Sequence, residues 1–187
     1  MKTEKFKIKG MICSRCLKVL NNELRETGAE VLDIQLGQVI IRYNPTKLNH
    51  TIINKIIHEN EFEIIWNEDS ILAEQIKRWI INYIWNTDLK ENLSEFLVEK
   101  LNKNYTYLSK NFSNVYGKTI ERYCLKLKIE RVKEFIENER LSFSEIAFRI
   151  GYQNASALSK QFKKETGMTM KDYKNLDAGK RIPIDKI

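Results

Sequence analysis

Two cysteines near the start of the chain have residue types and a spacing that could perform chemistry. Cys13 and Cys16 are three positions apart and follow an alternating segment, residues 6–9, which is typical of a half-buried strand. Cys16 falls in the first turn of a predicted helix, where open backbone amides and the helix dipole stabilise a thiolate, and Arg15 adds a positive charge. Two soft thiolates without a third ligand in the motif suit Cu(I) or another soft metal ion better than tetrahedral Zn²⁺.

The segments around this pair must form its scaffold. An apolar helix face runs from Leu17 to Leu24, and strand-like runs follow at residues 31–36, 39–43 and 62–66, with a second amphipathic helix at 52–57 between the last two. The order βαββαβ predicts a small sheet with two helices on one face, the ferredoxin-like arrangement. In that order the Gly37 turn and the end of the second helix return to the edge that carries the cysteines. His58 could therefore approach them, or it is an ordinary surface histidine.

The run Gly10-Met11-x-Cys13-x-x-Cys16, together with Tyr43-Asn44-Pro45, resembles the heavy-metal-associated domain of copper chaperones and metal-transporting ATPases. The resemblance covers about residues 3–67 and implies that Cys13 and Cys16 bind the metal, with Phe62 packed beside them. Ile12 and Glu61 differ from the residues usual in that family, which are threonine and glycine. Two alternatives are open: the pair binds nothing and the domain serves for association, or the fold is a thioredoxin-like redox domain.

A different pattern dominates the second half of the chain. Ser142 and Glu145 form a capping box, an apolar helix face ends at Gly151, and Asn154 is suited to cap a second helix. This is typical of a helix-turn-helix. A copy lies fifty residues upstream, because residues 108–123 and 158–173 share seven identities in sixteen gap-free positions. The chain therefore contains a duplicated module.

The runs Glu145-Ile146-Ala147-x-x-x-Gly151-Tyr152 and Leu158-Ser159-Lys160-x-Phe162-Lys163-Lys164-x-x-Gly167-Met168-Thr169 resemble the AraC/XylS family of bacterial transcription regulators. The resemblance covers roughly residues 71–176. It implies two helix-turn-helix modules joined by a long helix, here about residues 119–138, that read double-stranded promoter DNA and work with RNA polymerase. Met170 replaces a usual proline and Val98 a usual alanine.

The outward positions in the first turns of each reading helix are the candidate base contacts. Lysine can donate to guanine, asparagine can pair with adenine, and alanine can touch a thymine methyl group. An alternative is that the lysines contact only phosphate. The predicted DNA-binding residues are Thr106, Ser109 and Lys110 in the first module and Asn154, Ser156, Ala157 and Lys160 in the second.

The positive charge is concentrated in the second half. Residues 1–68 hold ten Lys/Arg and nine Asp/Glu, and residues 69–187 hold 22 and 16, so the net charges are +1 and +6. A phosphate-binding surface requires such an excess, although a merely soluble surface also produces one. The N-terminus lacks the apolar core of a signal peptide, and no run approaches the ~20 apolar residues that span a bilayer. We therefore expect a cytoplasmic protein without membrane contact.

These patterns predict the α+β fold class in three parts: a ferredoxin-like domain over residues 1–68, an all-α double helix-turn-helix domain over 69–177, and a basic, loosely ordered tail over 178–187. Residues 68–70 read as a polar link. The apolar stripe that starts at Leu72 reads as the first helix of the second domain or, alternatively, as a coiled-coil dimer seam.

The leading hypothesis is a sequence-specific transcription regulator that responds to a soft metal held by Cys13 and Cys16. One alternative is a regulator whose N-terminal domain only mediates association or partner binding. Another is a metal carrier with a docking C-terminal domain. The sequence shows no Ser/His/Asp grouping, no HExxH motif and no phosphate-cradling glycine loop, so we do not expect an enzyme.

Overall fold

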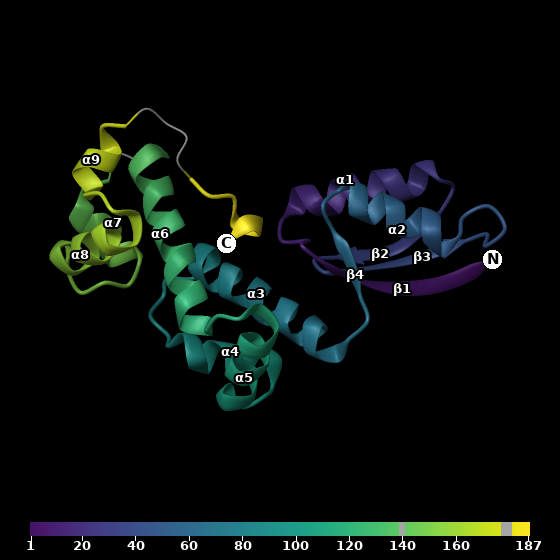
Figure 1. Cartoon of the computed structure of the whole chain (residues 1–187), viewed down its shortest axis with the longest axis horizontal. Helices are drawn as coiled ribbons and strands as arrows, with labels where there is room; N and C mark the ends of the chain where they lie inside the picture. Colours follow the sequence, from purple (N-terminus) through teal and green to yellow (C-terminus); the bar gives the residue numbers. More distant parts are fainter. Residues whose placement is uncertain (139–140, 177–180) are drawn as a thin grey trace. The chain divides into compact units, whose positions relative to one another are not determined.

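The computed structural model describes residues 1–138, 141–176 and 181–187. The chain divides into two compact units, Met1–Gln75 and Ile76–Ile187, whose helices and strands are labelled in Figure 1. Within the described part of the chain, no helix is both long and apolar enough to cross a membrane.

The first unit is a four-stranded antiparallel sheet covered by two helices. Its strands pair in the order β2-β3-β1-β4, and α1 and α2 lie side by side on one face of the sheet (Figure 1). The predicted βαββαβ order is confirmed. The elements are β1 (Lys2–Lys9), α1 (Ser14–Glu26), β2 (Glu30–Gln35), β3 (Gln38–Tyr43), α2 (His50–Glu59) and β4 (Glu63–Ile65).

The core of this unit follows from the alternation of its strands. Phe6 and Ile8 of β1 are fully buried, and Phe6 is paired with Val39 of β3, which is also buried. Successive side chains of a strand point to opposite faces, so the polar residues between them face outward. Leu20 and Leu24 of α1 close the core from the helix side.

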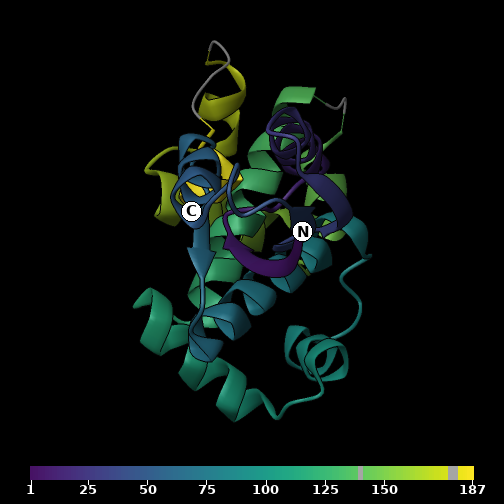
Figure 2. The same cartoon turned by 90° about the vertical axis from the view of Figure 1, so that its right-hand side faces the viewer.

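The second unit is all α-helical, which confirms the predicted fold class. Figures 1 and 2 agree that the helix pair α4–α5 lies at one end of α6 and the pair α7–α8 at the other. The long helix predicted over residues 119–138 is α6. The elements are α3 (Glu68–Asn86), which begins in the first unit, α4 (Leu93–Leu101), α5 (Tyr105–Tyr116), α6 (Ile120–Asn138), α7 (Phe143–Arg149), α8 (Ala155–Thr166), α9 (Met170–Lys174) and the 3₁₀ helix η1 (Ile184–Lys186).

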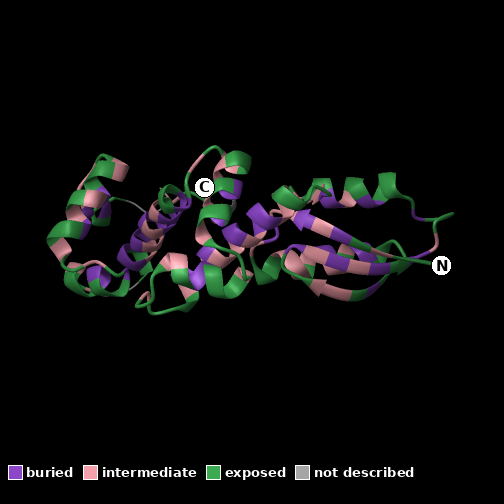
Figure 3. Ribbon diagram, turned by 90° about the horizontal axis from the view of Figure 1, so that it is seen from below, coloured by how far each residue is buried: buried purple, intermediate pink, exposed green. Residues whose placement is uncertain are grey.

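Each helix pair packs on its own set of apolar residues, and Figure 3 marks the buried residues of these helices in purple. In the second module, α6 contributes Ile129 and Val132, which pack with residues of α7, α8 and α9. Burial of such faces supplies most of the stability of short helices. The buried residues of the first module include Leu97, Leu108, Phe112, Ile120 and Tyr123, and those of the second include Ile146, Ala147, Leu158, Phe162 and Tyr173.

The residues 68–70 do not form a link; they are the first turn of α3. The Asn67 side-chain oxygen accepts hydrogen bonds from the backbone amides of Asp69 and Ser70, at 2.8 and 3.1 Å. A cap of this kind satisfies amides that a helix start leaves open, so the helix extends further toward the N-terminus than the apolar stripe alone indicates. Within the stripe, Ile80 is fully buried, as expected for a helix packed on a core and not for an exposed seam.

The C-terminal tail is not loosely attached where the structure describes it. Of its predicted range, residues 178–180 lie outside the described residues, as does residue 177 before it. The backbone amide of Ile182 donates to Glu130 of α6 at 2.9 Å, and the ammonium group of Lys118 donates to the carbonyl oxygen of Ile187 at 2.6 Å. These bonds hold residues 181–187 against α6 and the turn that precedes it.

Candidate nucleic-acid interface

The two candidate reading helices, α5 and α8, are built alike. Each has twelve residues. The side-chain oxygens of Asn104 and Asn154 cap them by accepting a hydrogen bond from the backbone amide three residues later, at 2.8 Å in both helices. Gly117 and Gly167 end them with φ of +64° and +80°, a left-handed conformation that favours glycine. The duplication seen in the sequence is therefore a duplication of complete, equally capped helices.

The inward faces of these helices determine which residues face solvent. Leu108 and Phe112 of α5 are fully buried, as are their counterparts Leu158 and Phe162 of α8. Because these pairs stand four residues apart on one helix face, the opposite side of each first turn is exposed, as Thr106 in α5 and Ser156 in α8 show. The exposed first turns of both helices are therefore the surfaces available to DNA.

Six of the seven predicted base-contacting residues are exposed. Ser109 is the exception, because it is half-buried. Its counterpart Ser159 is also half-buried and its hydroxyl lies 3.6 Å from the sulfur of Met170. The serine at this position therefore lies nearer the core than its neighbours do. The exposed residues are Thr106, Lys110, Asn154, Ser156, Ala157 and Lys160.

Asn154 has a structural task that limits how it can read a base. Its side-chain oxygen is already bonded to the Ala157 amide. Bidentate pairing with adenine uses both the oxygen and the nitrogen of an asparagine. In this conformation the amide nitrogen of Asn154 can donate to a base, whereas the oxygen already accepts from the Ala157 amide and is held in the orientation that this bond requires.

The fifty-residue offset of the two modules reveals a position that the sequence analysis did not single out. Tyr107 occupies the place in α5 that Ala157 occupies in α8, and its side chain is 45% exposed. The ammonium group of Lys103 lies 5.4 Å from the centre of its ring. An exposed ring in the first turn of a reading helix can make apolar contact with a base edge or sugar. Applying the repeat offset to each predicted contact would have found it.

Lysines surround the second reading helix. Lys163 and Lys164 are exposed in the last turn of α8, and Lys171 and Lys174 are exposed on α9. Cations at such positions can neutralise backbone phosphates without reading sequence. The local charge thus favours a polyanionic partner on this module.

The cysteine pair lies in the first unit, where β1 leads into α1. Cys13 is the N-cap residue of α1 and is exposed, Cys16 is half-buried in the first turn, and their sulfur atoms are 3.1 Å apart. Gly10 has φ of +91°, and a Cβ atom placed there would lie 3.3 Å from the ring of Phe62. The loop therefore passes close beside Phe62, where the resemblance to heavy-metal-associated domains places it.

The pKa values of the two thiols shift in opposite directions, and the pKa of Cys16, which lies in the first helical turn, is raised. Burial raises the pKa of Cys13, but hydrogen bonds from the Cys16 thiol and from backbone amides, with the charge of Arg15, lower the pKa further, so the net shift is downward. Burial and the neighbouring Cys13 raise the pKa of Cys16. Cys13 is therefore the more acidic thiol of the pair, because it is more exposed than Cys16 and accepts hydrogen bonds from backbone amides at the start of α1.

Among the described residues, no third side chain joins Cys13 and Cys16 in a group that could hold a metal ion. Over residues 1–138, 141–176 and 181–187, no group of three or more His, Cys, Asp and Glu side chains could hold a metal ion. His58 is exposed on α2 and belongs to no such group. Two neighbouring sulfur donors still fit a soft ion of low coordination number, for which Cys13 and Cys16 would be the ligands.

Comparisons with known proteins concern the helical half. Residues 97–175 match a family model described as a helix-turn-helix domain. The chain is 30% identical over 102 residues to the Msm operon regulatory protein of Streptococcus mutans serotype c (strain ATCC 700610 / UA159), covering 54% of this chain and 35% of that protein. It is 23% identical over 120 residues to the uncharacterized HTH-type transcriptional regulator YdiP of Escherichia coli (strain K12), covering 64% and 40%. The chain thus spans less than half the length of these curated relatives.

A solved structure supports the same fold. The C-terminal domain of AraT, a response regulator from Geobacillus stearothermophilus, superposes with a TM-score of 0.52 at 22% identity, covering 63% of this chain and 95% of that one. At this identity the likeness concerns the fold alone. With the matched residues 97–175 and the two capped modules around α6, it leads to one assignment. Residues 97–175 of this chain form a helix-turn-helix domain.

Proposed function

We propose that the protein is a sequence-specific DNA-binding transcription regulator of the AraC type, and not an enzyme, whose partners are double-stranded promoter DNA and RNA polymerase. The observation that carries this proposal is the pair of equally capped reading helices, α5 and α8, with exposed first turns at the two ends of one helix, α6. The names of the relatives, an operon regulatory protein and an HTH-type transcriptional regulator, support it.

Two reading helices in one chain imply an asymmetric site. Major grooves on one face of DNA recur every ~34 Å, so a single chain should protect about two turns. The experiment is selection of binding fragments from the genome by gel shift, followed by hydroxyl-radical footprinting. Two protected segments about one turn apart support the proposal. Protection confined to one groove contradicts the two-module reading, and absence of sequence preference contradicts the function.

A second proposal concerns the first unit: a soft monovalent metal ion such as Cu(I), bound by Cys13 and Cys16, changes DNA affinity. The observation that favours it is the pair of thiols 3.1 Å apart, of which Cys13 has a lowered pKa. The ion must bind one state of the protein better than another to act as a signal. Allosteric couplings of about 1–3 kcal/mol are typical, so DNA affinity should change roughly tenfold.

The test measures metal content after anaerobic purification with reductant, and then DNA affinity with and without Cu(I). Cys13→Ser/Cys16→Ser should abolish both the bound metal and the response. Cys124→Ser is the matched control, since Cys124 is buried in α6. If the native protein binds no metal and the double variant regulates its promoter normally, the first unit serves for association or partner binding instead.

A further inference from the structure

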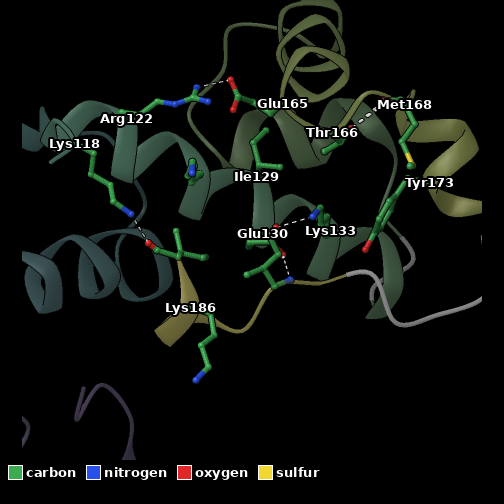
Figure 4. A pocket seen from close by; sticks show the side chains of 13 residues that line it. Lys118, Arg122, Ile129, Glu130, Lys133, Glu165, Thr166, Met168, Tyr173 and Lys186 are labelled. Carbon is green, nitrogen blue, oxygen red and sulfur yellow. Dashed lines mark hydrogen bonds and ion pairs between the residues drawn. The ribbon is translucent and has the colours of Figure 1, made fainter. Parts of the chain in front are cut away.

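A cavity in the second unit combines a cationic wall with an apolar floor. Its volume is about 520 Å³, within the range of roughly 300–1,000 Å³ that small-molecule sites occupy. The lining comes from the turn before α6 and from α6 itself, from the end of α8 and the turn that follows it, from α9 and from residues of the tail. Figure 4 shows the side chains that line it, with Ile129, Glu130 and Lys133 near its centre and Lys186 extending away from them.

The charges of the cavity are unbalanced. Of its thirteen lining side chains, five are cationic and two are acidic. Both carboxylates already have cationic partners: Glu165 accepts from Arg122 at 2.6 Å and Glu130 from Lys133 at 2.6 Å. The second oxygen of Glu130 accepts from the tail amide of Ile182. The two carboxylates are thus paired with Arg122 and Lys133, and Lys118, Lys126 and Lys186 are the cationic side chains of the lining outside these two ion pairs.

Two lysines carry most of this excess. Lys118 is half-buried, and its ammonium group donates a hydrogen bond to the backbone oxygen of Ile187 at 2.6 Å. Burial lowers the pKa of Lys118, and the charges of Lys126 and Lys77 lower it further. Like charges gathered in a partly buried place are stabilised when an anion enters. Lys126 is exposed at the same wall.

The floor is apolar. Ile129 and Met168 line it together with the ring of Tyr173, and Ile129 and Tyr173 belong to the buried core of the second module. A floor of this kind accommodates a carbon skeleton, while the cationic wall binds acidic oxygens. The apolar floor and the cationic wall together favour a small organic polyanion. An inorganic ion would contact the cationic wall but would bury less of the apolar floor.

We infer that this cavity is a binding site for a small organic polyanion, with Lys118 and Lys126 as its principal charge contacts. The shared chemistry of its ligands is a cluster of anionic oxygens on a small carbon body, which either a di- or tricarboxylate or a phosphate ester supplies. The site goes beyond the proposed function, because it lies away from the first turns of α5 and α8 and needs neither DNA nor the cysteine pair.

The experiment is calorimetric titration of the full chain with citrate and, separately, with glycerol 2-phosphate, at a constant ionic strength set with potassium chloride. Acetate is the singly charged control probe. We expect saturable binding of at least one polyanion at one site per chain, and weak or no binding of acetate. A preference for citrate or for the phosphate ester identifies the source of the anionic oxygens.

Substitutions of lining lysines show whether the cavity binds the polyanion, and they are chosen so that loss of binding can be distinguished from loss of folding. Lys126→Glu changes an exposed residue and should weaken polyanion binding at least tenfold, whereas Lys126→Arg should retain it. Lys118→Ala should also weaken binding, with intact folding checked by circular dichroism. Lys55→Ala, an exposed lysine of the first unit, is the matched control and should bind as the native protein does.

Titration in the presence of the selected DNA fragment separates this site from a phosphate contact of the DNA backbone. Polyanion binding that persists in the DNA complex supports the inference. Three results overturn it: no saturable binding of either polyanion, equal binding by Lys126→Glu, or complete displacement of the polyanion by DNA.

Discussion

Replacement of Asn154 tests whether its side chain serves the helix, the DNA or both. In the structure the side-chain oxygen of Asn154 accepts a hydrogen bond from the Ala157 amide, and the side-chain nitrogen can donate to a base. Loss of an N-cap costs about 1 kcal/mol, and loss of one neutral hydrogen bond costs about 0.5–1.5 kcal/mol, or roughly twofold to tenfold in affinity. We therefore expect Asn154→Ala to lower the free energy of unfolding by about 1 kcal/mol and DNA affinity by up to about tenfold.

Asn154→Ser separates the two effects. Serine caps helices about as well as asparagine but has no amide nitrogen, so the free energy of unfolding should stay within about 0.5 kcal/mol of the native value. Affinity for the selected DNA site should fall as it does for Asn154→Ala, with a changed preference at one base pair. Asn104 is the matched control, because its oxygen caps α5 in the same way; Asn104→Ala should cost the same stability.

The assay is urea unfolding followed by tryptophan fluorescence. A Trp66→Phe background confines the signal to Trp79 and Trp85, the remaining two of the three tryptophans, which lie in the α3 segment of the second unit. Equal losses of stability in Asn154→Ala and Asn154→Ser would refute the capping role. Unchanged affinity and base preference in both variants would refute the base contact and leave Asn154 as a cap only.

Three further outcomes are expected. Lys160→Ala should cost about 1–3 kcal/mol of DNA binding and relax the preference at one position; a uniform loss with a shallower salt slope, as expected for Lys174→Ala, would show a phosphate contact instead. Gly167→Ala should lower the free energy of unfolding by about 1 kcal/mol because φ is +80°, although a Cβ there meets nothing within 4 Å; urea unfolding measures this. Burial raises the pKa of Glu4, but hydrogen bonds from Tyr43, Lys2 and His50 lower it to about 2 from 4.5. That carboxylate should contribute about 1–3 kcal/mol above pH ~4.5, lost as the pH falls toward ~2, and Glu4→Gln should flatten this pH dependence of unfolding.

Much of the reading site could be predicted from the sequence, since its determinants are local. A cap, an apolar face and a terminal glycine lie within a dozen residues of one another, and the repeat at an offset of fifty residues supplied two copies of the same pattern. Exposure of Thr106 and Lys110, and of Ser156 and Lys160, follows from helical periodicity. The same periodicity placed Ser109 outward, but it is half-buried, as its counterpart Ser159 beside Met170 is.

The sequence by itself determined the element order, the ends of both reading helices and the position of the cysteine pair, because each depends on residues a few positions apart. Tertiary structure decided what depends on distant partners. The cavity exists because the tail is bonded to α6 and to the turn before it, through hydrogen bonds between residues 52 and 69 positions apart. The order of the two thiol pKa values depends on their unequal burial and on the direction of the hydrogen bond between them. The spacing of nearby residues predicts neither contacts between distant residues nor the unequal burial of two neighbouring cysteines. The cavity and the order of the two thiol pKa values therefore follow only from the folded structure.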